Sequence, residues 1–401
     1  MMEIKLLLLA LCASLLLAIT ATAQDDNEKK GYEFKQLKEL AYTPVKDQSR
    51  SGTCWSFSGI AFLEAEMIRM GKPETDLSEM FVVWHTYQQK AEKYVRLHGN
   101  LTFGPGGAFH DVTEMIKQYG IVPEPVYPGL NYGEEKHVHG ELDKMLGEQV
   151  KVATENSNKK LSTAWKQSVK GTLNAYLGEL PGQFEFEGKT YTPQSFASDY
   201  VGLNMNDYVE LTSFTHRPFY TSFALEIPDN WMWAQIYNVP IEELMEVIDN
   251  SIETGYTVAW GADVSERGFS TSSQGIAVVP DVDKEDMTDA EIAKWESLSD
   301  KEKDSELYKL DKPGVEKKID QQMRQIAFDN YESTDDHGML IVGTAKDQTG
   351  NRYYKVKNSW GKYNKYDGLF YASQPFVAYK TISIMVHRDA IPKDIRTKLG
   401  L

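Results

Sequence analysis

The chain has 401 residues and a formal net charge of −16 at pH 7. A strongly acidic surface repels nucleic acid and anionic membranes, so the composition argues against both as partners. The length permits a large buried core, arranged as two or three lobes or as one elaborate domain.

The N-terminus has the pattern of an export signal. Lys5 precedes an apolar run from Leu6 to Ile19, and the small residues Ala21-Thr22-Ala23 follow it. We therefore predict a signal peptide over residues 1–23 and a periplasmic or extracellular mature protein. The apolar run is shorter than the roughly 20 residues that span a membrane, so we expect no stable membrane anchor.

The sequence holds two cysteines, and one of them, Cys12, lies inside the predicted signal. Cys54 then has no partner for a disulfide within the mature chain. A lone thiol is often a small buried hydrophobe, and its other use is as a nucleophile. The surrounding sequence decides between the two readings.

Periodicity divides the chain into a helical front half and a strand-rich rear half. Apolar residues recur at helical spacing over residues 54–70, with a glycine-containing loop before Cys54 and Gly71 and Pro73 after the helix. Further helices are predicted over 77–97, with Asp76 or Ser78 as cap, and over 109–119, 134–178, 238–252 and 281–330. Strands are predicted over 256–261, 339–343, 353–356, 369–371 and 381–386.

The environment of Cys54 favours the nucleophile. The thiol sits where a loop becomes the first turn of a helix, and a helix N-terminus stabilises a thiolate. His337 stands directly before an apolar strand, which leaves its imidazole free to face a cleft. Asn358 follows another strand, where its carbonyl could fix the imidazole tautomer under the cover of Trp360. Gln48 could donate to an oxyanion together with the Cys54 backbone N–H.

Three sequence blocks carry a resemblance to a known family. QSRSGTCWSF, DDHGMLIVG and KNSWG, in that order, look like the glutamine, cysteine, histidine and asparagine blocks of the papain superfamily. The papain-type signature C-G-[SA]-C-[WY] reads here as residues 51–55, with Ser51 and Thr53 as the departures. Neither departure touches the nucleophile.

The spacing of the blocks separates subfamilies. The sequence distance from Cys54 to His337 is about twice the roughly 130–150 residues of ordinary papain-like enzymes. This enlargement is similar to the bleomycin hydrolase and bacterial aminopeptidase C subfamily (peptidase family C1B). The blocks DLSEMFVVW, GPGGAFHDV, YNVPIEELMEVIDNSI, DNYESTDDH and DAIPKDI also resemble that subfamily.

The resemblance implies an α+β papain-like fold of two lobes, one helical and one β-barrel-like, with a large helical insertion. Within a peptidase domain of residues 24–401, we assign residues 24–130 to the mainly helical lobe, 131–235 to the insertion and 236–401 to the β-rich lobe. The implied activity is peptide-bond hydrolysis through a Cys54 thioester, most simply by an aminopeptidase.

The resemblance also assigns roles to residues. Cys54 is the nucleophile, His337 the base and then the acid, Asn358 its orienting partner and Gln48 the oxyanion donor. The substrate backbone is expected beside the pair Gly106 and Gly107, with Trp55 and Trp360 in support. Singly, these residues could be loop caps, turn residues or strand-end caps.

Other assignments concern ligands and assembly. Peptides are the expected substrates, and no cofactor or metal is expected, because His137 and His139 form the only close histidine pair and lack a third ligand. The subfamily implies a homo-oligomer, usually a hexamer, whose C-terminal arm blocks the cleft. The arm here looks short, so an endopeptidase with an open cleft is the alternative. A non-catalytic binding protein and an acyl transferase on the same fold are further alternatives.

Overall fold

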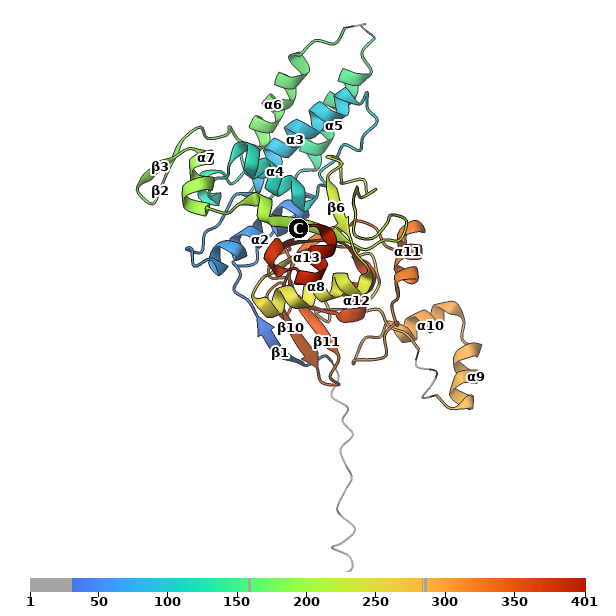
Figure 1. Ribbon diagram of the computed structural model, residues 1–401. Coiled ribbons are helices and arrows are strands. Elements are labelled where there is room, and N and C mark those ends of the chain that lie inside the picture. Colours follow the sequence, from blue (N-terminus) through green and yellow to red (C-terminus); the bar gives the residue numbers. More distant parts are fainter. Residues whose placement is uncertain (1–30, 158–159, 283, 285–286) are drawn as a thin grey trace, which may run out of the picture. The chain divides into compact units, whose positions relative to one another are not determined.

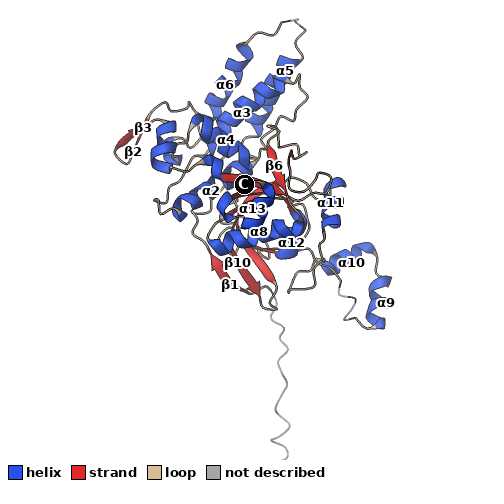
Figure 2. Cartoon of the chain, in the orientation of Figure 1, coloured by secondary structure: helices blue, strands red, loops and turns tan. Residues whose placement is uncertain are grey.

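A mixed sheet of eleven strands lies at the centre of the part of the chain that the structure describes (Figures 1 and 2). The computed structural model describes residues 31–401 apart from 158–159, 283 and 285–286. The predicted export signal lies outside these residues. The sheet has the order β5-β6-β4-β13-β7-β10-β11-β12-β9-β8, with β1 pairing with β10.

The strands and helices have the following bounds. The sheet strands are β1 (Phe34–Glu39), β4 (Tyr208–Thr212), β5 (Ser222–Ala224), β6 (Gln235–Asn238), β7 (Val258–Ala262), β8 (Phe269–Ser270), β9 (Ile276–Ala277), β10 (His337–Asp347), β11 (Arg352–Lys357), β12 (Leu369–Ser373) and β13 (Thr381–His387), and β2 (Phe184–Phe186) and β3 (Lys189–Tyr191) form a separate hairpin. The helices are α2 (Cys54–Arg69), α3 (Glu79–Arg96), α4 (Phe109–Tyr119), α5 (Gly140–Thr154), α6 (Ala164–Leu177), α7 (Pro193–Ser195), α8 (Ile241–Thr254), α9 (Asp289–Ser297), α10 (Asp300–Leu307), α11 (Gln321–Asp329), α12 (Gln374–Lys380) and α13 (Lys393–Leu399).

Local signals in the sequence fix several of these elements. The Ser78 hydroxyl accepts a hydrogen bond from the Phe81 backbone N–H at 3.0 Å, so Ser78 rather than Asp76 caps α3. Thr288 and Glu291 form the predicted capping box at the start of α9. The predicted rear strands are confirmed as β7, β10, β11, β12 and β13.

Alternation along β10 shows which helices cover the two faces of the sheet. Leu340 and Val342 belong to the hydrophobic core that includes α2, whereas Met339 and Ile341 belong to the core that includes α8. Successive side chains of a strand point to opposite faces. Helices α2 and α8 therefore cover opposite faces of the sheet, and β10 is buried between them.

The fold class predicted from the sequence, α+β with a helical and a β-rich lobe, is confirmed. The sheet is nevertheless open in the described residues, because its strand order runs from β5 to β8 without the two ends pairing. The β-rich lobe is thus not a closed barrel. The assigned lobe bounds stay a prediction.

The middle of the chain adds a layer of helices beside the first lobe. Helices α5 and α6 pack against each other and against α3 through buried residues that recur at helical spacing. These residues are Leu142, Leu146, Val150, Val169, Leu173 and Leu177. None of the described helices is both long and apolar enough to cross a membrane.

Candidate active site

Antiparallel pairing brings His337 and Asn358 together. His337 begins β10, Asn358 follows the last residue of β11, and Leu340 pairs with Lys357 across these two strands. The start of one antiparallel strand lies beside the end of its neighbour. The His337 Nε2 and Asn358 Oδ1 atoms are 2.7 Å apart.

The Asn358 amide is held in one orientation. Its Oδ1 atom also accepts a hydrogen bond from the Ser359 backbone N–H at 2.8 Å, and its Nδ2 atom donates to the Tyr363 hydroxyl at 3.1 Å. Because Oδ1 accepts, the proton of the neutral His337 ring resides on Nε2. The Nδ1 atom is thereby left as a proton acceptor.

Trp360 covers this pair as the sequence predicts. The Trp360 and His337 rings stack with their centroids 4.7 Å apart and an interplanar angle of 30°. Both His337 and Asn358 are buried, so little water competes for the bond between them. The imidazole is consequently fixed on one side by Asn358 and on one face by Trp360.

Cys54 is the first residue of α2 and reaches the same pocket as His337. The pocket walls include Cys54, Trp55, Gly107, Asp229, Asp335 and His337. Backbone hydrogen bonds from Gly338 and Trp55 reach the Cys54 thiol and lower its pKa. Since Gly338 follows His337 directly, the nucleophile and the imidazole adjoin the same short piece of β10.

Gly338 permits this close approach of α2 and β10. A Cβ atom added there would lie 2.5 Å from the Ser58 Oγ atom and 3.3 Å from the Cys54 carbonyl oxygen. A side chain at position 338 would therefore push the strand away from the helix. The glycine next to His337 is a packing requirement of the site.

Burial governs the resting charge state of the pair. It raises the pKa of the Cys54 thiol to about 12, and the charges of Asp335 and Asp229 add to this effect. Burial also lowers the pKa of His337 to about 4, although the bond to Asn358 opposes it. The sequence led us to expect a thiol pKa lowered by the helix N-terminus, but desolvation outweighs that effect. Both shifts favour the uncharged forms of the thiol and the imidazole.

Gln48 is tied to the Asn358 segment rather than to the pocket wall. Its backbone N–H donates to the Ser359 carbonyl at 2.8 Å, and its Oε1 atom accepts from the Ser359 hydroxyl at 2.6 Å. Accepting through Oε1 leaves the Gln48 amide N–H groups available for another acceptor. Its role as an oxyanion donor stays a prediction.

Of the two glycines expected beside the substrate, Gly107 lines the pocket and Gly106 contacts one of its wall residues. Gly107 lines the pocket and packs against Trp55, whose Nε1 atom donates to the Pro105 carbonyl at 2.9 Å. Gly106 does not line the pocket, but its Cα atom abuts the Asp229 carboxylate, which a Cβ atom would overlap. The buried Lys90 ammonium donates to the Gly104 and Gly106 carbonyls and thereby holds this turn.

Sequence reasoning missed Asp229 as a pocket residue. Asp335 and Asp336 were visible next to His337, but nothing in the local pattern distinguished them from an ordinary acidic turn. Asp229 comes from a segment more than a hundred residues before His337 in the sequence. Only the tertiary fold brings it to the thiol.

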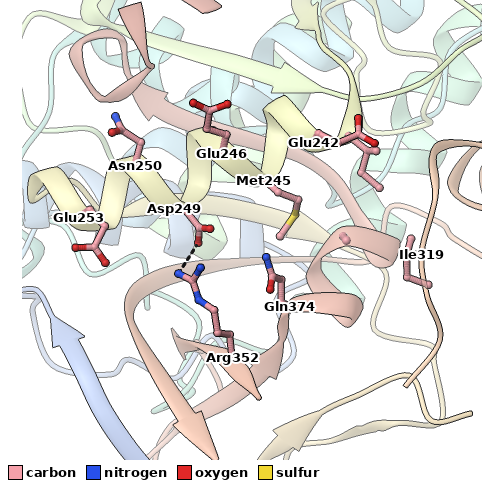
Figure 3. A pocket seen from close by; sticks show the side chains of 11 residues that line it. Glu242, Met245, Glu246, Asp249, Asn250, Glu253, Ile319, Arg352 and Gln374 are labelled. Atoms are coloured by element: carbon pink, nitrogen blue, oxygen red, sulfur yellow. Dashed lines mark hydrogen bonds and ion pairs between the residues drawn. The ribbon is translucent and has the colours of Figure 1, made fainter. Parts of the chain in front are cut away.

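A larger hollow lies elsewhere, between α8 and the β11–α12 region (Figure 3). Glu242, Glu246 and Glu253 project from α8, and Arg352 reaches Asp249 at 3.3 Å. The described residues that line this hollow include no cysteine and no histidine. The chemistry therefore belongs to the smaller pocket at Cys54.

His137 and His139 are buried beside the loop that carries Gln48. The Arg50 backbone bonds to the backbone of both, and the ring centroids lie 5.5 Å apart. Within the described residues, no group of three His, Cys, Asp or Glu side chains could hold a metal ion. Burial lowers the pKa of His137 to about 4 and that of His139 to about 3.

This burial predicts an acid-sensitive contribution to stability. The unfolded chain binds a proton at His139 below pH about 6.5, whereas the folded chain does not until about pH 3, so this contribution is present above pH 6.5 and lost on acidification. As the pH falls from 7.5 to 5, the free energy of unfolding of wild type should therefore decrease by about 2 kcal/mol more than that of the His139→Gln variant. Urea unfolding of both proteins at the two pH values measures this, and an unchanged difference would contradict it.

Comparison with known proteins identifies the fold and the family. The sequence model of the Peptidase C1-like family matches residues 87–301 and 294–400. The chain belongs to this family. It is therefore a cysteine-type peptidase, and its matched region includes His337 and Asn358. Cys54 and Gln48 lie before the matched region.

Individual relatives agree with this membership. Aminopeptidase C of Lactococcus lactis subsp. cremoris is 24% identical over 89% of this peptidase and 83% of its own length. Cysteine proteinase 1, mitochondrial, of Saccharomyces cerevisiae is 22% identical over 91% of this peptidase and 79% of its own length. The crystal structure of PepW from Lactobacillus rhamnosis HN001 superposes with a TM-score of 0.67 at 20% identity, over 91% and 84% of the two chains. That likeness supports the fold of the C1-like peptidase.

Proposed function

We propose that this C1-like peptidase is an aminopeptidase that removes N-terminal residues from peptides through a Cys54 thioester. One observation carries the proposal. The His337 imidazole, bonded to Asn358 at 2.7 Å, lines the same pocket as the thiol at the N-terminus of α2. The relatives named aminopeptidase C support the exopeptidase specificity.

The reaction follows from the proton positions. The Cys54 thiol gives its proton to the free Nδ1 atom of His337 as sulfur attacks the substrate carbonyl. Creating both charges together offsets much of the burial cost that either charge would bear alone. The imidazolium then protonates the leaving amine, and a thioester remains. Water, deprotonated by His337, hydrolyses the thioester and restores the thiol.

A matched pair of reporters tests the specificity. We expect an alanyl reporter with a free α-amine to be cleaved under reducing conditions, and its N-acetylated counterpart to be cleaved at least about tenfold more slowly. Mass spectrometry of an unblocked peptide should show stepwise loss of single N-terminal residues. Equal rates on the two reporters, or cleavage inside the peptide, would instead identify an endopeptidase with an open cleft.

The location of the enzyme is part of the proposal. The pattern of residues 1–23 supports export to the periplasm or the extracellular space. N-terminal sequencing of the protein recovered outside the cytoplasm should begin just after Ala23, and a retained Met1 in the mature protein would contradict export. In an oxidising location the Cys54 thiol is the group at risk, so activity should rise on addition of a thiol reductant.

Assembly is a secondary proposal. The subfamily resemblance supports a homo-oligomer, with a hexamer as the expected form. Light scattering coupled to size-exclusion chromatography gives the mass directly. The mass of a single chain, which is 45.5 kDa before the predicted signal is removed, would contradict assembly without affecting the proposed chemistry.

A further inference from the structure

Recognition of a free α-amine places a strict demand on the pocket. The α-nitrogen of the N-terminal residue is two bonds from the carbonyl carbon that Cys54 attacks. A group that binds this ammonium must therefore line the same pocket as the thiol. The pocket wall contains three carboxylates, from Asp229, Asp335 and Asp336.

Asp336 already has partners within the protein. Its Oδ1 atom accepts from the Thr334 hydroxyl at 2.7 Å, and its Oδ2 atom accepts from the Val264 backbone N–H at 3.1 Å. Asp229 and Asp335 accept no hydrogen bond and form no ion pair with another described residue. Carboxylates that lack a protein partner in a partly desolvated pocket favour an incoming cation.

The segment that carries Asp229 is firmly anchored. The Asn230 side chain bonds to the backbone of Leu225 and Ala234, and the Trp231 indole N–H donates to the buried Asp111 carboxylate at 2.8 Å. The Asp229 carboxylate packs against the backbone of Gly106. A backbone segment held this rigidly keeps Asp229 at a defined side of the pocket, which suits the residue to positioning a ligand.

The Asp229 charge acts on Asp335, and both carboxylates add to the rise that burial causes in the pKa of the Cys54 thiol. Burial raises the pKa of Asp335 to about 8, and the charges of Asp229, Asp336 and Glu210 add to it while His110 opposes it. Burial also raises the pKa of Asp229, which the Lys90 ammonium opposes. Both carboxylates act on the Cys54 thiol. A cation bound between them would favour the ionised forms of both carboxyl groups.

We propose that the carboxylates of Asp229 and Asp335 bind the α-ammonium group of the substrate and thereby determine exopeptidase specificity. This inference rests on the proposed aminopeptidase activity and names the residues that select for it. Asp229 lies on the Gly106 side of the pocket, and Asp335 lies two residues before His337. The ammonium bound by them sets the carbonyl carbon beside the thiol, because only two bonds separate the two atoms.

The test compares two reporters that differ only in the amine. An alanyl amide carries the α-ammonium, whereas the propionyl amide has the same carbon skeleton without it. For wild type we expect kcat/KM to favour the alanyl reporter. In Asp229→Asn, which keeps the side-chain shape, the ratio of the alanyl to the propionyl kcat/KM should fall roughly tenfold or more. Asp335→Asn should change the preference in the same direction.

A matched control is available on the same segment. Glu226 lies three residues before Asp229, is exposed, and faces Arg217 and His216 outside the pocket. The Glu226→Gln variant removes one negative charge at nearly the same place in the sequence. Its preference for the alanyl reporter should equal that of wild type.

The possible outcomes distinguish a failure of the two carboxylates to bind the ammonium from the absence of aminopeptidase activity. Wild type that cleaves neither reporter contradicts the aminopeptidase itself. Wild type that prefers the alanyl reporter, while Asp229→Asn and Asp335→Asn keep that preference, contradicts only the assignment of the two carboxylates. Equal losses on both reporters would mean a structural role and would also overturn the assignment.

A measurement on wild type covers the case in which a variant fails to fold. Alaninal and propanal both form a reversible hemithioacetal with an active-site thiol, and only alaninal carries the amine. Alaninal should inhibit at least about tenfold more strongly than propanal, and the advantage should shrink as salt rises. Equal inhibition constants would contradict recognition of the ammonium in this pocket.

Discussion

Replacing Cys54 by alanine is expected to lower kcat/KM on the alanyl reporter by roughly 10⁴-fold or more. Cys54 supplies the only thiol among the described residues that line the pocket, so alanine cannot form the thioester, although it retains the backbone hydrogen bonds at the start of α2. The fold should therefore survive. Parallel measurements of hydrolysis and of thermal unfolding distinguish lost chemistry from lost structure.

A control variant on the same helix makes this result specific. Ser58, one turn further along α2, donates to the Cys54 carbonyl at 2.7 Å without taking part in the chemistry, so Ser58→Ala should retain most activity. A Cys54→Ala protein that keeps more than about one hundredth of the wild-type rate would rule out the assigned nucleophile.

The second large effect is expected at His337. His337→Ala removes the proton acceptor from a pocket where burial already raises the thiol pKa, so the thiolate cannot form at neutral pH. We expect kcat/KM to fall by roughly 10³-fold or more. Asn358→Ala leaves the imidazole in place but unoriented, and the loss should be smaller, at roughly 10- to 100-fold.

Which of the two variants, His337→Ala or Asn358→Ala, loses more activity tests whether Asn358 only orients the imidazole, and a ranking of their rates is needed. Steady-state rates for wild type and both variants at pH 7 provide it, with His387→Asn as a control, because His387 ends β13 outside the pocket. A loss in Asn358→Ala as large as that in His337→Ala would mean that Asn358 does more than hold the ring. An active His337→Ala enzyme would require another base.

Local pattern was enough to predict the elements that position the site. The helix that begins at Cys54 and the strands on either side of the His337–Asn358 pair follow from apolar periodicity and from turn residues at their ends. The adjacency of His337 and Asn358 also follows, because consecutive antiparallel strands place the beginning of one beside the end of the other. The structure joins the two residues, and their catalytic roles stay predictions.

What the sequence could not provide depends on long-range packing. Asp229 lines the pocket of the thiol because its segment is fixed by the bond between Trp231 and Asp111, and no periodicity or motif marks it. The same limit applies to protonation. A helix N-terminus suggested a lowered thiol pKa, but the degree of burial that raises it is a property of the assembled pocket. The sequence also could not predict that the sheet is open, because this depends on whether the edge strands β5 and β8 pair with each other.

The central claim is that Cys54 is a nucleophile activated by His337. The most direct measurement is peptide mapping by mass spectrometry after the enzyme is treated with an epoxide inactivator that carries an aminoacyl group. We predict one adduct, on Cys54, formed in step with the loss of activity and much more slowly in His337→Ala. Inactivation without a Cys54 adduct, or an adduct that leaves the activity intact, would contradict the claim.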